Sequence, residues 1–248
     1  MLKIGMLTPS SNTILEPVTY QILSNISNVS AHFSRFVVRE IALSDEANNQ
    51  FRDVPMLEAA ALLADADVDL IVWNGTAASW MGLDKDRRLC RLIKEKTGIS
   101  ATTSSLAIME ATEALNVSKI GLVTPYTADV SSKIREQYER LGYECPVERM
   151  SGIAVNKEFA SVPQTRIKEM LEEAARTENV NALAVICTNF HAAGLVVEIE
   201  QKYGIHVIDS VSATLWHSLH LLGISPAPLA EKWGHLFNMK SKEVQYGV

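Results

Sequence analysis

The chain alternates between short apolar runs and longer amphipathic segments. The apolar runs have the length of buried strands, and the segments between them have the periodicity of helices that cover a sheet. This alternation is typical of βαβ units, in which the strands are parallel. The pattern predicts strands at 3–8, 32–38, 69–73, 119–124, 181–186 and 206–208, and helices at 56–66, 85–96, 105–115, 129–141 and 163–176.

A similar pattern occurs twice along the chain. IGMLTPSSN at 4–12 resembles IGLVTPYTAD at 120–129, and GISATTSSLAIMEA, from Gly98, resembles GIHVIDSVSATLWH, from Gly204. Between these matches, Gly75 in WNGTA corresponds to Cys187 in ICTNF. Three matches in the same order favour a duplicated half over the general likeness of all βαβ units.

The predicted fold class is therefore α/β, with two pseudo-symmetric Rossmann-like lobes, each a mainly parallel sheet flanked by helices. We expect residues 1–115, together with the C-terminal segment 211–248, to form the first lobe, and residues 116–210 to form the second. Ligands of such sheets bind beyond the carboxyl ends of the strands. A small substrate is therefore expected in the cleft between the lobes.

Composition and charge limit the partners. The chain has 248 residues, 47% of them hydrophobic, and its net charge of -6 comes without a basic cluster, so neither nucleic acid nor an anionic membrane is an expected partner. The N-terminus is typical of a first strand rather than a signal peptide, and no apolar run approaches the roughly 20 residues of a membrane helix. We expect a cytoplasmic protein that acts on a small molecule. The sequence leaves open whether it forms a homodimer.

The turns after the predicted strands are polar and almost uncharged. Their hydroxyls, amides and backbone N–H groups suit a carboxylate. GxxxxGK[ST], GxGxxG, HExxH and GxSxG motifs are all missing, which disfavours a nucleotide cofactor, a zinc site and a serine hydrolase. We therefore expect no cofactor and no metal. The turns lie at 8–12, 74–77, 124–127 and 187–189.

Cys187 is the reactive side chain among these turns. A cysteine at the end of a buried strand is often a small packing residue, but a thiol with a pKa of about 8.5 also exchanges its proton near neutral pH and can serve as an acid or base. Cys90 and Cys145 are predicted to be structural. Three cysteines without CxxC spacing favour neither a disulfide framework nor a thiolate metal site.

Several motifs together resemble the aspartate/glutamate racemase superfamily, in particular its branch of maleate isomerases and arylmalonate decarboxylase. They are IGMLTPSSNTILEP, HFSR, WNGTAASW, GISATTSSLAIMEA, KIGLVTPYTADV and VICTNF. The resemblance implies two pseudo-symmetric lobes and cofactor-free chemistry at a carbon next to a carboxylate. Racemases and maleate isomerases of this kind use two cysteines. Here the second corresponds to Cys187, and the first falls on Gly75, a vacant position.

Arylmalonate decarboxylase has the same pattern of one glycine and one cysteine. In that enzyme one carboxylate leaves as carbon dioxide, the other becomes an enediolate in a dioxyanion hole, and the cysteine protonates one face. The resemblance thus implies that Cys187 is the proton donor. The implied carboxylate-binding residues are Pro9, Asn12, Thr76, Ala77, Tyr126, Thr188 and Asn189.

The chain also departs from the decarboxylase pattern. Ala77 replaces a hydroxyl residue of the dioxyanion hole, and Thr188-Asn189 replaces a glycine-rich turn. Asn12 and Arg35 resemble the maleate isomerases instead, in which the asparagine binds a substrate carboxylate. The surroundings are therefore isomerase-like, whereas the single cysteine is decarboxylase-like.

Three functions follow as hypotheses. The first is a lyase that decarboxylates a substituted malonate or a related small dicarboxylate through an enediolate protonated by Cys187. The second is a maleate cis-trans isomerase or an Asp/Glu-type racemase, and the third is a carboxylate-binding protein without turnover. The segments 41–51 and 153–159 are expected to set the substrate side chain.

Overall fold

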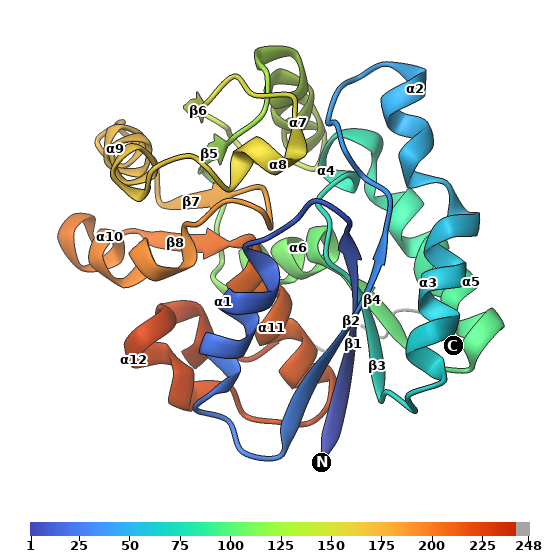
Figure 1. Ribbon diagram of the computed structural model, residues 1–248. Helices are drawn as coiled ribbons and strands as arrows, with labels where there is room; N and C mark the ends of the chain where they lie inside the picture. Colours follow the sequence, from blue (N-terminus) through green and yellow to red (C-terminus); the bar gives the residue numbers. More distant parts are fainter. Residues whose placement is uncertain (242–248) are drawn as a thin grey trace.

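The protein contains two four-stranded sheets in which every strand is parallel to its neighbours (Figure 1). The computed structural model describes residues 1–241. The sheet orders are β2-β1-β3-β4 and β6-β5-β7-β8, so both halves have the same topology, and the predicted two-lobed α/β fold is confirmed. The strands are β1 (Leu2–Pro9), β2 (Val29–Phe36), β3 (Leu70–Trp73), β4 (Ala101–Thr103), β5 (Ile120–Thr124), β6 (Glu148–Met150), β7 (Ala182–Val185) and β8 (His206–Asp209).

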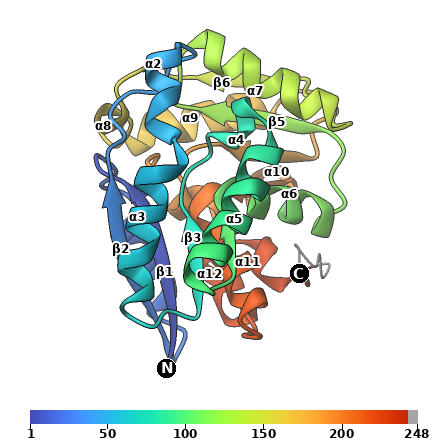
Figure 2. The ribbon, with the colours of Figure 1, turned by 90° about the vertical axis from the view of Figure 1, so that its right-hand side faces the viewer.

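Helices cover both faces of the first sheet. α3 and α5 pack on one face, toward the viewer in Figure 2, and α1 and α11 pack on the other. α6 and α11 contact each other and both sheets, so this helix pair joins the lobes. The helices are α1 (Leu15–Leu23), α2 (Asp45–Asn48), η1 (Asn49–Phe51), α3 (Asp53–Ala64), α4 (Ala78–Met81), α5 (Leu83–Thr97), α6 (Ser104–Ala114), α7 (Ala128–Arg140), α8 (Asn156–Phe159), α9 (Gln164–Ala175), η2 (Ala193–Leu195), α10 (Val196–Tyr203), α11 (Ser210–Leu221), η3 (Ala227–Leu229), α12 (Ala230–Trp233) and η4 (His235–Asn238).

The repeated Gly-Ile segments occupy the same place in each lobe. Gly98 ends α5 and Gly204 ends α10, with φ of +76° and +66°, a left-handed conformation that glycine adopts at low steric cost. After the next strand, Thr103 caps α6 and Asp209 caps α11, because their side-chain oxygens accept backbone N–H groups. The sequence repeat thus encodes the same helix-strand-helix unit twice.

The apolar pattern locates six of the eight described strands and misses β4 and β6, and the helices it predicts do not include α1, α10 and α11. β4 and β6 have the sequences ATT and ERM, which contain no apolar run, and pairing with β3 and β5 defines them. The strand expected at 32–38 begins at Val29, because Val29 pairs with Leu2. The lobe boundaries near 115 and 211 stay a prediction, and residues 242–248 of the C-terminal segment lie outside the described residues.

The apolar core lies where helices cover both faces of a strand. β3, β5 and β7 are buried along their whole length, as expected for central strands of a parallel sheet. Within residues 1–241, no helix is both long enough and apolar enough to cross a membrane.

Candidate active site

The carboxyl ends of the central strands of both sheets meet at one small cavity, here called the inner cavity. Strand order reverses at β1 and β3 in one sheet and at β5 and β7 in the other, and ligands of parallel sheets bind at such points. The inner cavity has a volume of about 20 Å³. Its lining residues are Pro9, Val38, Ile41, Phe51, Trp73, Gly75, Thr76, Ala77, Trp80, Tyr126, Asn156, Cys187 and Thr188. Predicted site residues from all four strand ends therefore lie together.

Cys187 follows β7 and is 3% exposed. Its backbone N–H donates to Ser210 Oγ at 3.1 Å, and its Sγ accepts the backbone N–H of Asn189 at 3.3 Å. Burial raises the pKa of the thiol to about 12, and hydrogen bonds from Tyr126 and Asn189 oppose this shift. The thiol is therefore protonated near neutral pH, which is the form that donates a proton.

Tyr126 and Thr76 bring hydroxyl groups from opposite lobes into contact. Tyr126 Oη lies 3.0 Å from Thr76 Oγ1, and the Tyr126 ring packs edge-on against Trp80 and Phe159. Burial raises the pKa of Tyr126 well above its ordinary value, so its hydroxyl stays neutral. Because the described residues that line the inner cavity include no charged side chain, negative charge on a bound carboxylate would be stabilised by neutral donors.

Asn12 and Asn189 lie beside the inner cavity rather than on its wall. Asn12 Oδ1 accepts the backbone N–H groups of Ile14 and Leu15 where α1 begins, at 3.0 and 2.9 Å, and its Nδ2 donates to Thr188 Oγ1 at 3.1 Å. Asn189 Oδ1 accepts the backbone N–H of Thr13 at 3.0 Å, and its Nδ2 donates to the backbone oxygen of Asn156 at 2.7 Å. Both amides thus hold turns of the two lobes together. Their predicted carboxylate contacts stay predictions.

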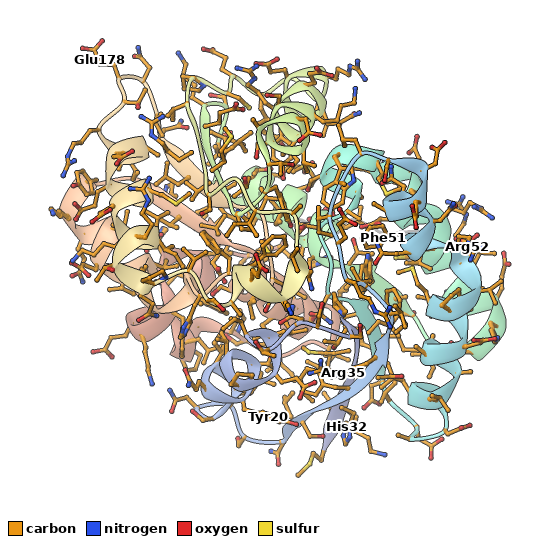
Figure 3. All side chains as sticks on the ribbon, turned by 45° about the horizontal axis from the view of Figure 1, so that its top comes forward. Tyr20, His32, Arg35, Phe51, Arg52 and Glu178 are labelled. Atoms are coloured by element: carbon orange, nitrogen blue, oxygen red, sulfur yellow. The ribbon has the colours of Figure 1, made fainter. Side chains whose placement is uncertain are left out.

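Arg35 holds the turn that carries Asn12. Its Nη1 donates to the backbone oxygens of Ser10 and Asn12, both at 2.9 Å, and its Nη2 pairs with Glu16. Arg35 is not among the residues that line the inner cavity, and Figure 3 shows it on the first lobe beside α1. Its contacts assign it to positioning this turn.

Gly75 faces an indole ring. An ideal Cβ atom built on Gly75 would lie 2.0 Å from Cζ2 of Trp73, well inside van der Waals contact. Phe36 and Phe51 pack against this indole, with ring centroids 5.0 and 6.3 Å away. The space beside Gly75 is therefore filled by the Trp73 indole.

The segment between β2 and α3 closes the inner cavity from the first lobe. The backbone N–H of Ile41 donates to the oxygen of Ala154, and the N–H of Asn156 donates to the oxygen of Arg39, both at 2.9 Å. Both segments expected to set the substrate, 41–51 and 153–159, contribute to the lining. A volume of about 20 Å³ holds about one water molecule, so a dicarboxylate can enter only if part of this wall moves.

Sequence reasoning missed three residues of the site. Trp73 and Trp80 flank the polar turn in WNGTAASW, and both line the inner cavity. Ser210 Oγ accepts the N–H of Cys187 and donates to the backbone oxygen of Val185. The aromatic residues at both ends of a small polar turn were an available signal, whereas nothing in the sequence places Ser210 beside Cys187.

Asp86 on α5 is a fully buried carboxyl group behind the wall formed by Trp73 and Ala77. It lines a second small cavity of about 10 Å³, here called the middle cavity, together with those two residues and Lys85. Burial raises the pKa of Asp86 from 3.8 to about 7, and nearby hydroxyl groups of Thr103 and Ser105 oppose the shift.

We expect Asp86 to make stability fall as the pH rises. The folded state binds the Asp86 proton more tightly than the unfolded state, so its contribution is complete below about pH 4 and is lost as the pH rises to about 7. In Asp86→Asn, the free energy of unfolding should decrease less steeply between these pH values in urea titrations. Asp84→Asn, an exposed change in the same turn, is the control, and an unchanged slope in Asp86→Asn would contradict the expectation.

The fold and the site together define a two-lobed α/β protein with a buried thiol where the strand ends of both lobes meet. Among residues 1–241, no group of three or more His, Cys, Asp or Glu side chains is placed to hold a metal ion. The chain belongs to the arylmalonate decarboxylase family, whose model matches residues 12–237.

Named relatives place the chain in the predicted branch of the superfamily. A maleate isomerase from Nocardia farcinica is 26% identical over 235 residues, which cover 91% of this chain and 92% of that enzyme. Arylmalonate decarboxylase from Bordetella bronchiseptica is 24% identical over 166 residues, which cover 66% of this chain and 69% of that enzyme. The predicted superfamily branch is confirmed, and both relatives are enzymes.

Solved structures of both kinds share the fold. The Nocardia farcinica isomerase, as a Cys-to-Ser mutant with a covalently bound succinylcysteine intermediate, superposes with a TM-score of 0.81 at 25% identity and covers 91% of this chain and 94% of its own. A liganded arylmalonate decarboxylase with one Gly-to-Cys and one Cys-to-Ser change gives a TM-score of 0.79 at 18% identity and covers 90% and 93%.

Proposed function

We propose that the chain is a cofactor-independent enzyme that acts at a carbon next to a carboxylate of a small substrate, with Cys187 as the group that exchanges a proton with that carbon. Support comes from the surroundings of the thiol. It is buried and protonated, and it lies beside the neutral hydroxyl groups of Tyr126 and Thr76. A carboxylate whose charge increases during the reaction would be stabilised at such a place.

Within this chemistry, the reaction that the site supports best is decarboxylation of a substituted malonate. The bond from the α-carbon to one carboxylate breaks, carbon dioxide leaves, and the electron pair stays on the second carboxylate as an enediolate. Cys187 then gives its proton to the α-carbon, and the thiolate recovers a proton from solvent. The observation that carries this proposal is the single thiol, because Trp73 fills the place of a second one at Gly75.

Isomerisation of a cis-unsaturated dicarboxylate is the second candidate, and the relatives favour it over decarboxylation. By sequence, three maleate isomerases match 90–91% of the chain, whereas the Bordetella bronchiseptica decarboxylase matches 66% of it. The Nocardia farcinica structure is a Cys-to-Ser mutant that contains a covalently bound succinylcysteine intermediate. In this chain, Cys187 would itself have to add to the double bond, or a group other than a thiol would have to assist on the first lobe.

Product analysis in deuterated water separates the candidates. The purified protein is incubated with aryl- and alkylmalonates, with maleate and with single enantiomers of aspartate and glutamate. Decarboxylation predicts carbon dioxide and an acid with one deuterium at the α-carbon. Conversion of maleate to fumarate, or loss of optical activity, without carbon dioxide would select isomerisation or racemisation. Recovery of every substrate intact, with no deuterium uptake, would overturn the proposal and favour a binding protein.

A further inference from the structure

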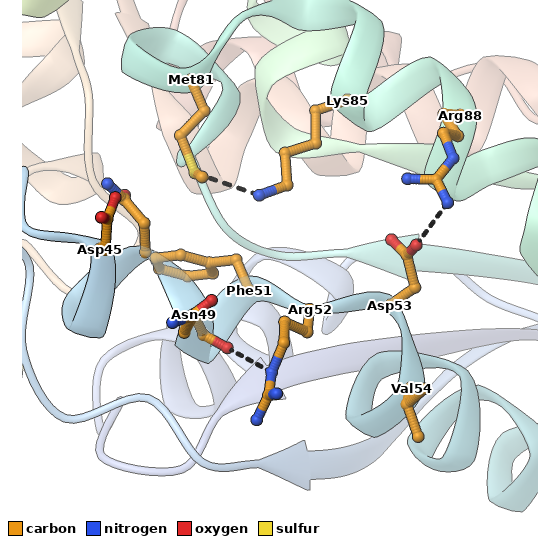
Figure 4. Close-up of a pocket in the computed structure, with 10 residues that line it drawn as sticks. Asp45, Asn49, Phe51, Arg52, Asp53, Val54, Met81, Lys85 and Arg88 are labelled. Atoms are coloured by element: carbon orange, nitrogen blue, oxygen red, sulfur yellow. Dashed lines mark hydrogen bonds and ion pairs between the residues drawn. The ribbon is translucent and has the colours of Figure 1, made fainter.

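A much larger cavity lies between the α2–η1 segment and the α4–α5 segment (Figure 4). It has a volume of about 690 Å³, which is in the range of small-molecule pockets, and is here called the outer pocket. It belongs to the first lobe, and Cys187 is not among its lining residues. The chemistry proposed for Cys187 therefore leaves this pocket without a role.

The outer pocket, the middle cavity and the inner cavity are neighbours that share wall residues. Phe51, Asp53 and Lys85 line both the outer pocket and the middle cavity. Phe51, Trp73 and Ala77 line both the middle and the inner cavity. Figure 3 shows Phe51 nearer the middle of the molecule and Arg52 nearer its edge. Phe51 therefore lines all three spaces, and a molecule that spans them requires the walls between them to move.

The two arginines among the described residues that line the outer pocket are held by first-lobe groups. Arg88 Nη2 pairs with Asp53 Oδ2 at 2.8 Å, and Arg52 Nε donates to the backbone oxygen of Asn49 at 3.2 Å. Both contacts are drawn in Figure 4. These contacts fix the rim of the pocket.

Lys85 has a different environment. Its ammonium group extends into the outer pocket, where it lies 3.6 Å from the thioether sulfur of Met81 (Figure 4). A thioether is a weak acceptor that leaves most of the hydrogen-bonding capacity of an ammonium group unused. Burial lowers the pKa of Lys85, and the carboxyl groups of Asp53 and Asp86 oppose the shift. An anion beside Lys85 would supply the strong acceptor that the thioether does not.

We propose that the outer pocket is a subsite for a second, distal carboxylate of the substrate, and that Lys85 is the residue that binds it. The substrate class is then an extended dicarboxylate, with its reacting end at Cys187 and its other end at Lys85. The inference rests on the proposed function for the assignment of the reacting end. A cationic binding group there would favour dianions over monoanions.

Unreactive ligands test this subsite without turnover. We would measure binding of the saturated α,ω-dicarboxylates from succinate to sebacate by calorimetry, each against the monocarboxylate of the same chain length. The wild type should prefer the dicarboxylate at one or more lengths by about 10-fold or more, because a hydrogen bond to a charged group is stronger than one between neutral groups. Lys85→Met, which keeps the chain length and removes the charge, should abolish this preference and leave monocarboxylate binding unchanged.

Lys94→Met provides the matched control, because Lys94 is exposed on the same helix and is not among the residues that line the outer pocket. Its preference should equal that of the wild type. No dicarboxylate preference in the wild type, or an equal loss of both ligand types in Lys85→Met, would overturn the subsite. The same titrations are made with Cys187→Ala, so that the two proposals are tested separately. This variant should lose turnover and keep the preference for dicarboxylates. Normal turnover of Cys187→Ala would remove the proposed function without affecting the result for Lys85.

Discussion

Replacing Cys187 with alanine is expected to lower kcat by about 10²- to 10⁴-fold on any substrate that the wild type turns over, because general acid-base catalysis contributes about that much. The thiol lines the inner cavity together with Tyr126 and Thr76, and in the proposed reaction it gives its proton to the carbon bound there. Burial keeps it protonated near neutral pH. The measurement is the initial rate, together with the deuterium content of the product in deuterated water.

The other two cysteines are controls for this change. Cys90 lies on α5 and Cys145 follows α7, and neither lines the inner cavity. Cys90→Ala and Cys145→Ala should retain wild-type kcat, with only small changes in thermal midpoint. If Cys187→Ala kept wild-type kcat, or if Cys90→Ala lost as much activity, the role assigned to Cys187 would be wrong.

Replacing Gly75 with cysteine is expected to destabilise the protein by at least about 1–3 kcal/mol, the usual cost of overpacking a core. The new Cβ atom would overlap Cζ2 of Trp73, and the indole is itself packed against Phe36 and Phe51. A thiol forced into this place should therefore give little exchange at the substrate carbon. Urea unfolding measures the first effect, and deuterium uptake by single enantiomers of the product acid measures the second.

A smaller residue at Trp73 should change the outcome. In Gly75→Cys with Trp73→Leu the overlap is removed, so the second thiol can lie across from Cys187 and should bring in exchange at both faces of the carbon, as in a two-base racemase. Gly194→Cys is the control, because an added Cβ there meets no atom within 4 Å. If Gly75→Cys alone had wild-type stability and gave rapid deuterium exchange, the Trp73 indole would not exclude a side chain at position 75.

The sequence located most of the residues that line the inner cavity, because local patterns mark strand ends. Thr76, Tyr126 and Cys187 each follow a predicted strand, and parallel strands bring their carboxyl ends to one edge of a sheet. Asn12 and Asn189 were also found, but in the structure Asn12 donates to Thr188 and Asn189 accepts from Thr13, each in a turn of the other lobe. A polar residue at a strand end is a candidate for ligand binding and for lobe contact alike, and only its partners distinguish these roles.

Sequence by itself determined the α/β class, the duplication and the absence of a thiol at Gly75, since each depends on the order and spacing of residues. Tertiary structure alone decided that the Trp73 indole fills the space beside Gly75 and that the outer pocket lies next to the inner cavity. Trp73 is adjacent in sequence to the polar turn, yet the direction of its indole depends on packing against Phe36 and Phe51. Likewise, the sequence shows Lys85 only as one lysine on an amphipathic helix. The fold places it in the lining of a pocket that shares the wall residue Phe51 with the inner cavity. The direction of a side chain and the sharing of wall residues between pockets depend on contacts between segments that are distant in sequence. The periodicity of the sequence contains no information about these contacts.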